Sequence, residues 1–157
     1  MKILQLCKKF PFPLKDGESI AVTYMARAFD ELGSDVTLLA MNTSKHWFDP
    51  AQLPETFDHY RAIHTVDIDN RLKPGAALRN LFSDRSYHIE RFENRVFEEK
   101  LIEVLQKDRF DIIQLETLYL APYLPVIRKY SSAPIALRSH NVEHEIWERV
   151  AANSLPV

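Results

Sequence analysis

The sequence contains a single cysteine, three glycines and no hydrophobic run long enough to cross a membrane as a helix. Cys7 has no second cysteine to pair with, so an internal disulfide is excluded and a reducing, cytoplasmic compartment is favoured. The G-x-G-x-x-G fingerprint of dinucleotide binding is absent. The net charge of -2 provides no overall basic field, so we do not expect a nucleic-acid-binding protein.

Length and composition indicate an ordinary globular domain. The 157 residues, of which 46% are hydrophobic and 27% are charged, are enough for one domain with a single core. No internal repeat or low-complexity segment interrupts the chain. We therefore treat residues 1–157 as one folding unit.

The first part of the chain predicts a strand, a helix and a second strand. Residues Lys2–Cys7 form an apolar run that is typical of a strand, and a loop with prolines follows it. Apolar residues recur at helical spacing between Ile20 and Leu32, and Gly33 stands where helices commonly end in a left-handed residue. Residues 36–41 form the second apolar run. This order predicts a βαβ unit with two parallel strands.

The rest of the chain continues the alternation. Residues 42–63 show no regular period and predict an ordered excursion. Beyond them the predicted elements are a strand at 64–68, helices at 74–82 and 87–106, a strand at 110–115, a helix at 119–130 and a strand around Ile135. The whole pattern predicts an alternating α/β domain with a mostly parallel sheet.

Polar residues come directly after the strand around Ile135. They are Ser139, His140 and Asn141. Open α/β sheets bind ligands just beyond the carboxyl ends of their strands, which makes His140 the leading candidate for chemistry. The alternative is a structural histidine that caps the next helix.

His140 is also part of a possible metal motif. Together with Glu143 and His144 it spells H-x-x-E-H, a pattern known from zinc enzymes. A catalytic zinc of this kind needs a third protein ligand, and no Asp, Glu, His or Cys follows Glu148. We therefore expect no metal.

Two other segments are candidates for ligand binding. Gly17 lets the backbone approach a ligand closely, and the helix that begins near Ser19 directs its N–H groups and positive dipole toward the same place. The alternative is an ordinary surface loop whose Phe10 and Phe12 cover the core. Glu116 follows the strand at 110–115, where it either binds a sugar hydroxyl or caps the next helix.

The remaining histidines and basic residues receive weaker interpretations. His46, His59 and His64 lack metal-like spacing, and we interpret them as scattered surface histidines without a role. Basic residues between Arg71 and Arg95 could face an anionic membrane that carries a lipid-linked substrate. Acidic residues are interleaved with them, which favours a solvated face of mixed charge.

Several stretches in order support a resemblance to a known family. They are Lys2-Ile3-Leu4-Gln5-Leu6, the Pro-rich loop with Asp16-Gly17, the helix that ends at Leu32-Gly33 before Ser34-Asp35-Val36-Thr37-Leu38-Leu39, Phe110-Asp111-Ile112-Ile113-Gln114-Leu115, and Leu137-Arg138-Ser139-His140-Asn141. Together they resemble the N-terminal half of a GT-B glycosyltransferase of the family 4 type. The resemblance covers the full length of the chain.

The resemblance implies a fold and an activity. The fold is a Rossmann-like three-layer sandwich with a mostly parallel sheet, one half of a two-domain enzyme. The activity is the retaining, metal-independent transfer of a sugar from a nucleotide-sugar to a saccharide or lipid-linked acceptor, without a cofactor. Such enzymes act in polysaccharide biosynthesis in the cytoplasm, in some cases at the inner face of the membrane.

The resemblance also implies roles for individual residues. The family's glycine loop matches Gly17 and faces the donor phosphates and the acceptor. The family's histidine after the later strand matches His140, which would contact the donor sugar near the reacting centre and is our catalytic candidate. The other candidate binding residues are Asp16, Glu18, Glu116, Ser139 and Asn141.

Residues 1–157 would then form the acceptor-side domain, and the domain that holds most of the nucleotide would lie outside them. A cleft enzyme without one wall loses the groups that stabilise the leaving diphosphate, so we expect this chain to be inactive or nearly so alone. Two alternatives stay open. One is a non-catalytic α/β partner module with Ile146 and Trp147 at its interface. The other is half of another nucleotide-sugar enzyme, such as an epimerase.

Overall fold

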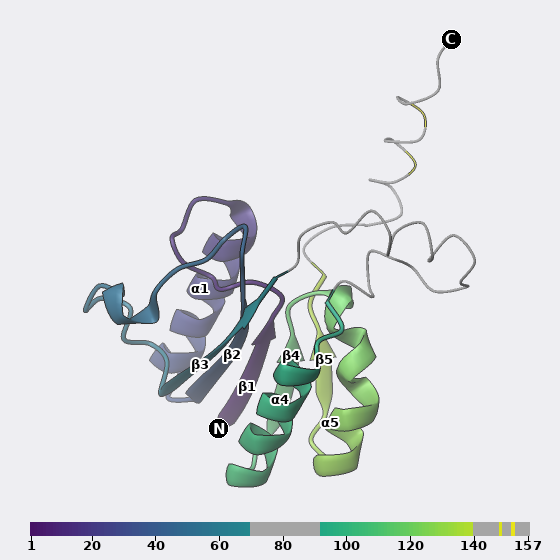
Figure 1. Cartoon of the computed structure of the whole chain (residues 1–157). Coiled ribbons are helices and arrows are strands. Elements are labelled where there is room, and N and C mark those ends of the chain that lie inside the picture. Colours follow the sequence, from purple (N-terminus) through teal and green to yellow (C-terminus); the bar gives the residue numbers. More distant parts are fainter. Residues whose placement is uncertain (70–91, 140–147, 149–151, 153–157) are drawn as a thin grey trace.

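The computed structural model describes residues 1–69, 92–139, 148 and 152. In this part of the chain five strands form one sheet with the order β3-β2-β1-β4-β5, and every neighbouring pair is parallel (Figure 1). The strands are β1 (Lys2–Cys7), β2 (Asp35–Thr43), β3 (Ala62–Ile68), β4 (Ile112–Leu115) and β5 (Ile135–Leu137). The prediction of a mostly parallel sheet is confirmed.

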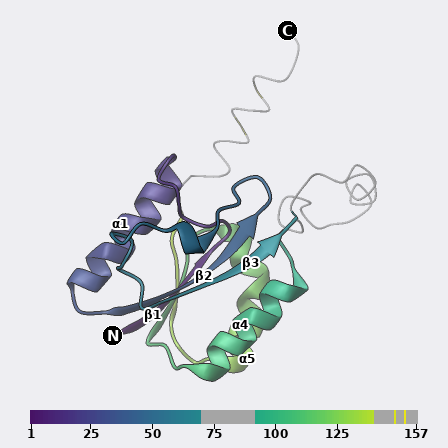
Figure 2. The ribbon, with the colours of Figure 1, turned by 60° about the vertical axis from the view of Figure 1, so that its left-hand side comes forward.

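Helices cover both faces of this sheet. Helix α1 (Gly17–Glu31) lies on one face, and α4 (Arg95–Lys107) and α5 (Leu124–Tyr130) lie side by side on the other, as both views show (Figure 1 and Figure 2). Two short 3-10 helices, η1 (Pro50–Gln52) and η2 (Leu118–Tyr123), belong to the connections. The fold is therefore a Rossmann-like three-layer sandwich, as expected from the sequence.

Burial of both faces explains why the strands read as continuous apolar runs. Along β2, Leu38 and Ala40 join the core cluster beneath α1, whereas Leu39 and Met41 join the cluster beneath α4 and α5. All four side chains are fully buried. Successive side chains point to opposite faces, so a strand between two helical layers must be apolar at every position.

The predicted end of the first helix at Gly33 is confirmed, and the helix begins at Gly17, two residues before the predicted start near Ser19. Gly33 has φ +75°, a left-handed conformation that favours glycine, and its N–H donates to the carbonyl of Asp30. Asp16 is the N-cap, and its carboxylate accepts a hydrogen bond from the Ser19 N–H at 3.0 Å. The helix runs directly from the loop that follows β1.

Two predicted helices differ from the structure. Residues 87–91 of the helix predicted at 87–106 lie outside the described residues, and within the described part α4 begins at Arg95, because the extended backbone and side chain of Asn94 cap it there. The helix predicted at 119–130 is split into η2 and α5, and Pro125 stands in the first turn of α5, where its missing N–H is harmless. The helix predicted at 74–82 lies outside the described residues.

The strand order places one switch point in the sheet. After β1 the chain adds β2 and β3 on one side, and it later adds β4 and β5 on the other side of β1. Sheets of this kind bind ligands beyond the carboxyl ends of the two strands at such a point, here β1 and β4. None of the helices in the described ranges is long and apolar enough to cross a membrane.

Candidate functional site

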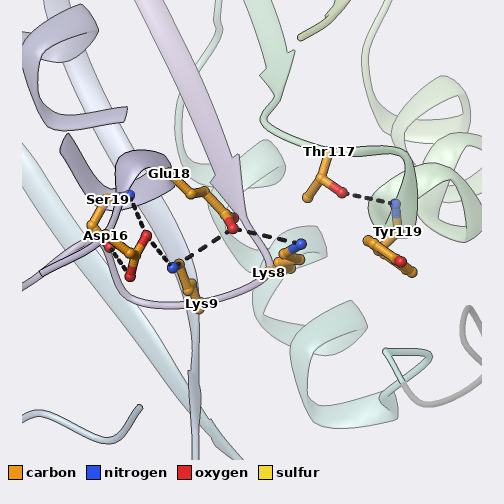
Figure 3. A network of polar contacts seen from close by, with 7 residues as sticks. All are labelled: Lys8, Lys9, Asp16, Glu18, Ser19, Thr117 and Tyr119. Atoms are coloured by element: carbon orange, nitrogen blue, oxygen red, sulfur yellow. Dashed lines mark hydrogen bonds and ion pairs between the residues drawn. The ribbon is translucent and has the colours of Figure 1, made fainter. Parts of the chain in front are cut away.

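The candidate site lies where β1 and β4 end side by side. Leu6 of β1 pairs with Leu115 of β4, so the residues that follow both strands emerge at one edge of the sheet. Lys8 and Lys9 come from the loop after β1, and Thr117 and Tyr119 come from the segment after β4 (Figure 3). We call this group, together with Asp16, Glu18 and Ser19, the switch-point site.

Lysine and carboxylate groups form the centre of this site. Lys9 Nζ lies 2.7 Å from Asp16 Oδ1 and 3.6 Å from Glu18 Oε2. Lys8 Nζ lies 3.5 Å from Glu18 Oε2 and 4.6 Å from the centre of the Tyr119 ring. Glu18 thus connects the two lysines, and Lys8 spans the edge of the sheet toward the β4 side (Figure 3).

Asp16 is held ionised by its neighbours. Partial burial alone would raise the pKa of its carboxyl group, but hydrogen bonds from Lys9 and the Ser19 N–H outweigh that effect and lower the pKa to about 2. The Ser19 hydroxyl donates a further bond to the same carboxylate at 3.3 Å. One N–H group at the start of α1 is therefore already occupied by the cap. A direct role of Asp16 in ligand binding remains a prediction.

Gly17 is the first residue of α1, and the fold does not require a glycine there. It is exposed, its φ is not positive, and a Cβ atom at this position would meet nothing within 4 Å. Neither backbone conformation nor packing explains the absence of a side chain. This leaves close approach of a ligand as a reason that can be tested.

Glu116 is completely buried, and its carboxylate is engaged by protein groups. Its Oε1 accepts hydrogen bonds from the side-chain amides of Gln5 and Gln114, and its Oε2 lies 2.9 Å from Arg138 Nε. Tyr60 extends the chain of contacts by donating to Gln5 Oε1 at 2.9 Å. Glu116 therefore ties β1, β4 and the end of β5 together.

The alternative that Glu116 caps the next helix is wrong. The cap of η2 is Thr117, whose hydroxyl accepts the Tyr119 N–H at 3.2 Å (Figure 3). Binding of a sugar hydroxyl by Glu116 remains a prediction, and its 0% exposure means that a ligand would have to displace protein partners.

Ser139 is exposed and lies just beyond β5. The Arg138 N–H donates to the Leu115 carbonyl at 2.9 Å, which keeps Ser139 close to the end of β4. His140 and Asn141, as well as Glu143, His144, Ile146 and Trp147, lie outside the described residues. Of the seven candidate residues, the structure thus gathers Asp16, Gly17 and Glu18 at the N-terminal end of α1 and places Glu116 in the sheet interior.

The loop after β1 also has a structural function. Phe10 is 1% exposed and stacks on Phe48 with 6.1 Å between ring centres, and Phe12 packs edge-on against Phe48 and Phe57. These contacts confirm that Phe10 and Phe12 pack on the core. The same loop nevertheless carries the lysines of the site.

The basic residues of this region are not among the site residues predicted from the sequence. Lys8, Lys9, Lys45 and His46 line two neighbouring cavities, of about 260 and 440 Å³, at the carboxyl edge of the sheet. The paired lysines directly after the first strand were the signal that could have indicated Lys8 and Lys9, since strand ends are where such sheets bind ligands. Nothing local in the sequence indicated that Lys45 would join them.

His59 differs from its prediction as a surface histidine. It is 2% exposed, and its ring packs against Phe57 and Tyr60. Among the described residues, no group of three or more His, Cys, Asp or Glu side chains could hold a metal ion. Metal independence remains a prediction.

Comparisons with known proteins support the fold alone. No protein-family model matches the chain, and no curated protein matches it. One similar solved structure is the C-terminal domain of a hydrogenase from Pyrococcus furiosus, with a TM-score of 0.54 and 18% sequence identity over 87% of this chain and 88% of that one. At this identity the similarity concerns the arrangement of strands and helices.

Proposed function

We propose that this chain is the N-terminal, acceptor-side domain of a retaining GT-B glycosyltransferase of the family 4 type. The observation that carries the proposal is the coincidence of two features. The ordered stretches that resemble this family include the Asp16-Gly17 loop, and that loop lies with Lys8 and Lys9 at the switch point of a parallel sheet. A glycine that the fold does not need, at the start of α1, adds support.

The proposed reaction assigns positioning roles to this domain. His140 would donate a hydrogen bond from a ring nitrogen to the donor sugar, and the start of α1 at Gly17 would face the donor diphosphate, where N–H groups and a helix dipole favour negative charge. No residue of this chain forms a covalent intermediate in the proposed front-face transfer. The second domain would supply most contacts to the nucleotide, and the reaction would take place at the cytoplasmic side of the membrane or in the cytoplasm.

The first test concerns the native polypeptide and its activity. A two-domain enzyme should have about twice the 18.3 kDa mass of this chain, because chains that outgrow one core divide into domains of this size. The native polypeptide is then assayed for transfer from a panel of nucleotide-sugars to saccharide and lipid-extract acceptors. A native product that ends at Val157, or efficient transfer by the isolated chain, would contradict the proposal.

We expect His140→Ala in the native enzyme to lower turnover about a hundredfold, the usual effect of losing one contact to a charged transition state. The measurement is the initial rate of sugar transfer at saturating donor. His64→Ala is the matched control, because this half-buried histidine belongs to the edge strand β3. An unchanged rate in His140→Ala would assign His140 a structural role.

Gly17→Ala separates a ligand requirement from a folding requirement. A Cβ at Gly17 has open space, and alanine favours helix over glycine, so we expect stability to be unchanged or raised by about 0.5 kcal/mol. If a donor phosphate approaches this backbone, the same change should raise the KM for the nucleotide-sugar at least about tenfold, the equivalent of 1.4 kcal/mol of binding energy. Thermal unfolding and donor KM are measured together. A stable variant with an unaltered KM would show that no ligand lies close to Gly17.

A further inference from the structure

The smaller of the two cavities has no assigned role, and its lining is basic. It measures about 260 Å³ and lies beside the carboxyl ends of β1 and β2. Its lining residues in the described part of the chain are Lys8, Lys9, Glu18, Thr43, Lys45, His46 and Phe92. Among these residues three lysines stand against one carboxylate, which favours an anionic occupant.

The lysines of this cavity are not saturated by Glu18. The separations of Lys8 Nζ and Lys9 Nζ from Glu18 Oε2 are 3.5 and 3.6 Å, longer than the roughly 2.7–2.9 Å of a charge-assisted hydrogen bond. Each ammonium group carries three N–H donors. Lys9 can therefore keep its 2.7 Å bond to Asp16 and still donate to a ligand in the cavity.

Thr43 supplies an independent observation. It is the last residue of β2, it lines the cavity, and it is 1% exposed. Its hydroxyl oxygen is buried and has no hydrogen-bond partner among the described residues. Buried hydroxyl groups are normally satisfied, so an unpartnered hydroxyl on a residue that lines the cavity is a hydrogen-bond donor left for a ligand.

The larger cavity extends this basic region with aromatic rings. It measures about 440 Å³, shares Lys9, Lys45 and His46 with the smaller cavity, and is lined in addition by Trp47 and Phe48. Trp47 is 58% exposed. An accessible aromatic ring beside charged groups suits a ligand that has both an anionic group and a sugar or base ring that can pack on it.

We propose that the smaller cavity is a phosphate subsite, in which Lys8, Lys9, Lys45 and Thr43 donate hydrogen bonds to a phosphoryl group of the ligand. The larger cavity would hold the organic part of the same ligand. The inference rests on the proposed function only for the source of this group, which is either a phosphorylated saccharide acceptor or the diphosphate of the nucleotide donor. The two sources share the chemistry and are separated by experiment.

The test is a titration of the 157-residue chain with inorganic phosphate, in which NMR of the His46 ring measures the pKa of His46 at each phosphate concentration. A His46→Gln variant assigns the His46 signals. Burial and the charges of Lys9 and Lys45 lower the pKa of His46. A bound phosphate adds negative charge and should raise this pKa in a saturable way. Absence of a saturable change would overturn the proposal.

Variants test the assignment of individual donors. We expect Lys45→Ala to weaken phosphate binding about tenfold, the effect of one hydrogen bond to a charged group, and Thr43→Val to weaken it severalfold without changing side-chain volume. Lys45 is exposed, so its loss should leave the fold intact. Lys100→Ala on α4 is the control, because Lys100 pairs with Glu103 away from the cavity. Equal weakening by the control would mean nonspecific attraction and would overturn the subsite.

Three further ligands identify the source of the phosphoryl group. If glucose 6-phosphate binds with a lower dissociation constant than uridine diphosphate, the phosphoryl group in the cavity belongs to the acceptor. If uridine diphosphate binds more tightly, it belongs to the donor. Methyl glucoside that binds as tightly as glucose 6-phosphate would overturn a phosphate subsite. These are binding measurements on the chain alone, so their failure is distinct from a failure to detect sugar transfer by the native enzyme.

Discussion

Glu116→Gln should destabilise the domain by about 3–5 kcal/mol, the cost of removing one partner from a buried ion pair. The carboxylate is 0% exposed, pairs with Arg138 at 2.9 Å and accepts from Gln5 and Gln114. An amide at this position presents N–H donors toward groups that are themselves donors. Arg138 would also lose the charge that neutralises it.

Urea unfolding followed by circular dichroism measures this effect as a change in the free energy of unfolding. Glu99→Gln is the matched control, since Glu99 forms an ion pair with Arg95 on the surface of α4, where the two side chains are 59% and 90% exposed. The control should cost about 0.5 kcal/mol or less. If Glu116→Gln lowered the free energy of unfolding by no more than the control does, Glu116 would not stabilise the sheet. That result would favour the prediction that Glu116 binds a ligand.

Acid should destabilise the domain through His59 by about 3 kcal/mol between pH 6.5 and pH 4. Burial is the main cause that lowers the pKa of His59 to about 4, Arg27 acts in the same direction, and Asp58 and Asp30 oppose it. Both ring nitrogens are buried, and neither has a hydrogen-bond partner in the part of the chain that the structure describes. Below roughly pH 6.5, the pKa of His59 in the unfolded chain, the unfolded chain binds a proton at His59 and the folded chain does not. The contribution of His59 to the free energy of unfolding is therefore fully present above that pH and is lost as the pH falls toward 4.

His59→Phe should remove this loss, because phenylalanine keeps an aromatic ring against Phe57 and Tyr60 and cannot be protonated. The free energy of unfolding is measured at several pH values between 4 and 7. Asp16→Asn serves as the control. The pKa of the Asp16 carboxyl group is about 2, so the stability that this carboxylate provides is lost only below about pH 4, outside the range in which His59 acts. An unchanged slope between pH 6.5 and 4 in His59→Phe would contradict the assignment.

Local sequence patterns predicted the secondary structure where a single residue or a single hydrophobic period determines an element. Gly33 ends α1 in a left-handed conformation, and the apolar run of β2 reports burial on both faces. The patterns failed where a local cap competed with helical periodicity. Asn94 starts α4 later than the periodicity suggested, and Pro125 separates α5 from η2.

The candidate site was predictable only in its parts. The loop after β1 and the residues after β4 were identified because strand ends and helix starts can be read locally. Their chemistry was not, because Glu116 has its partners Gln5 and Arg138 on other strands or beyond them. His59 likewise gave no sign of burial, since no regular period surrounds it.

The sequence by itself determined the alternation of strands and helices, the parallel direction of the sheet and the ends of α1, because these follow from hydrophobic period, side-chain volume and backbone preference over a few neighbouring residues. The tertiary structure alone decided the strand order β3-β2-β1-β4-β5. That order brings Lys8, Thr43 and Lys45 around one cavity and buries Glu116 opposite Arg138. The physical reason is that such contacts join residues far apart in the chain, and their energy depends on the packing of the whole sheet.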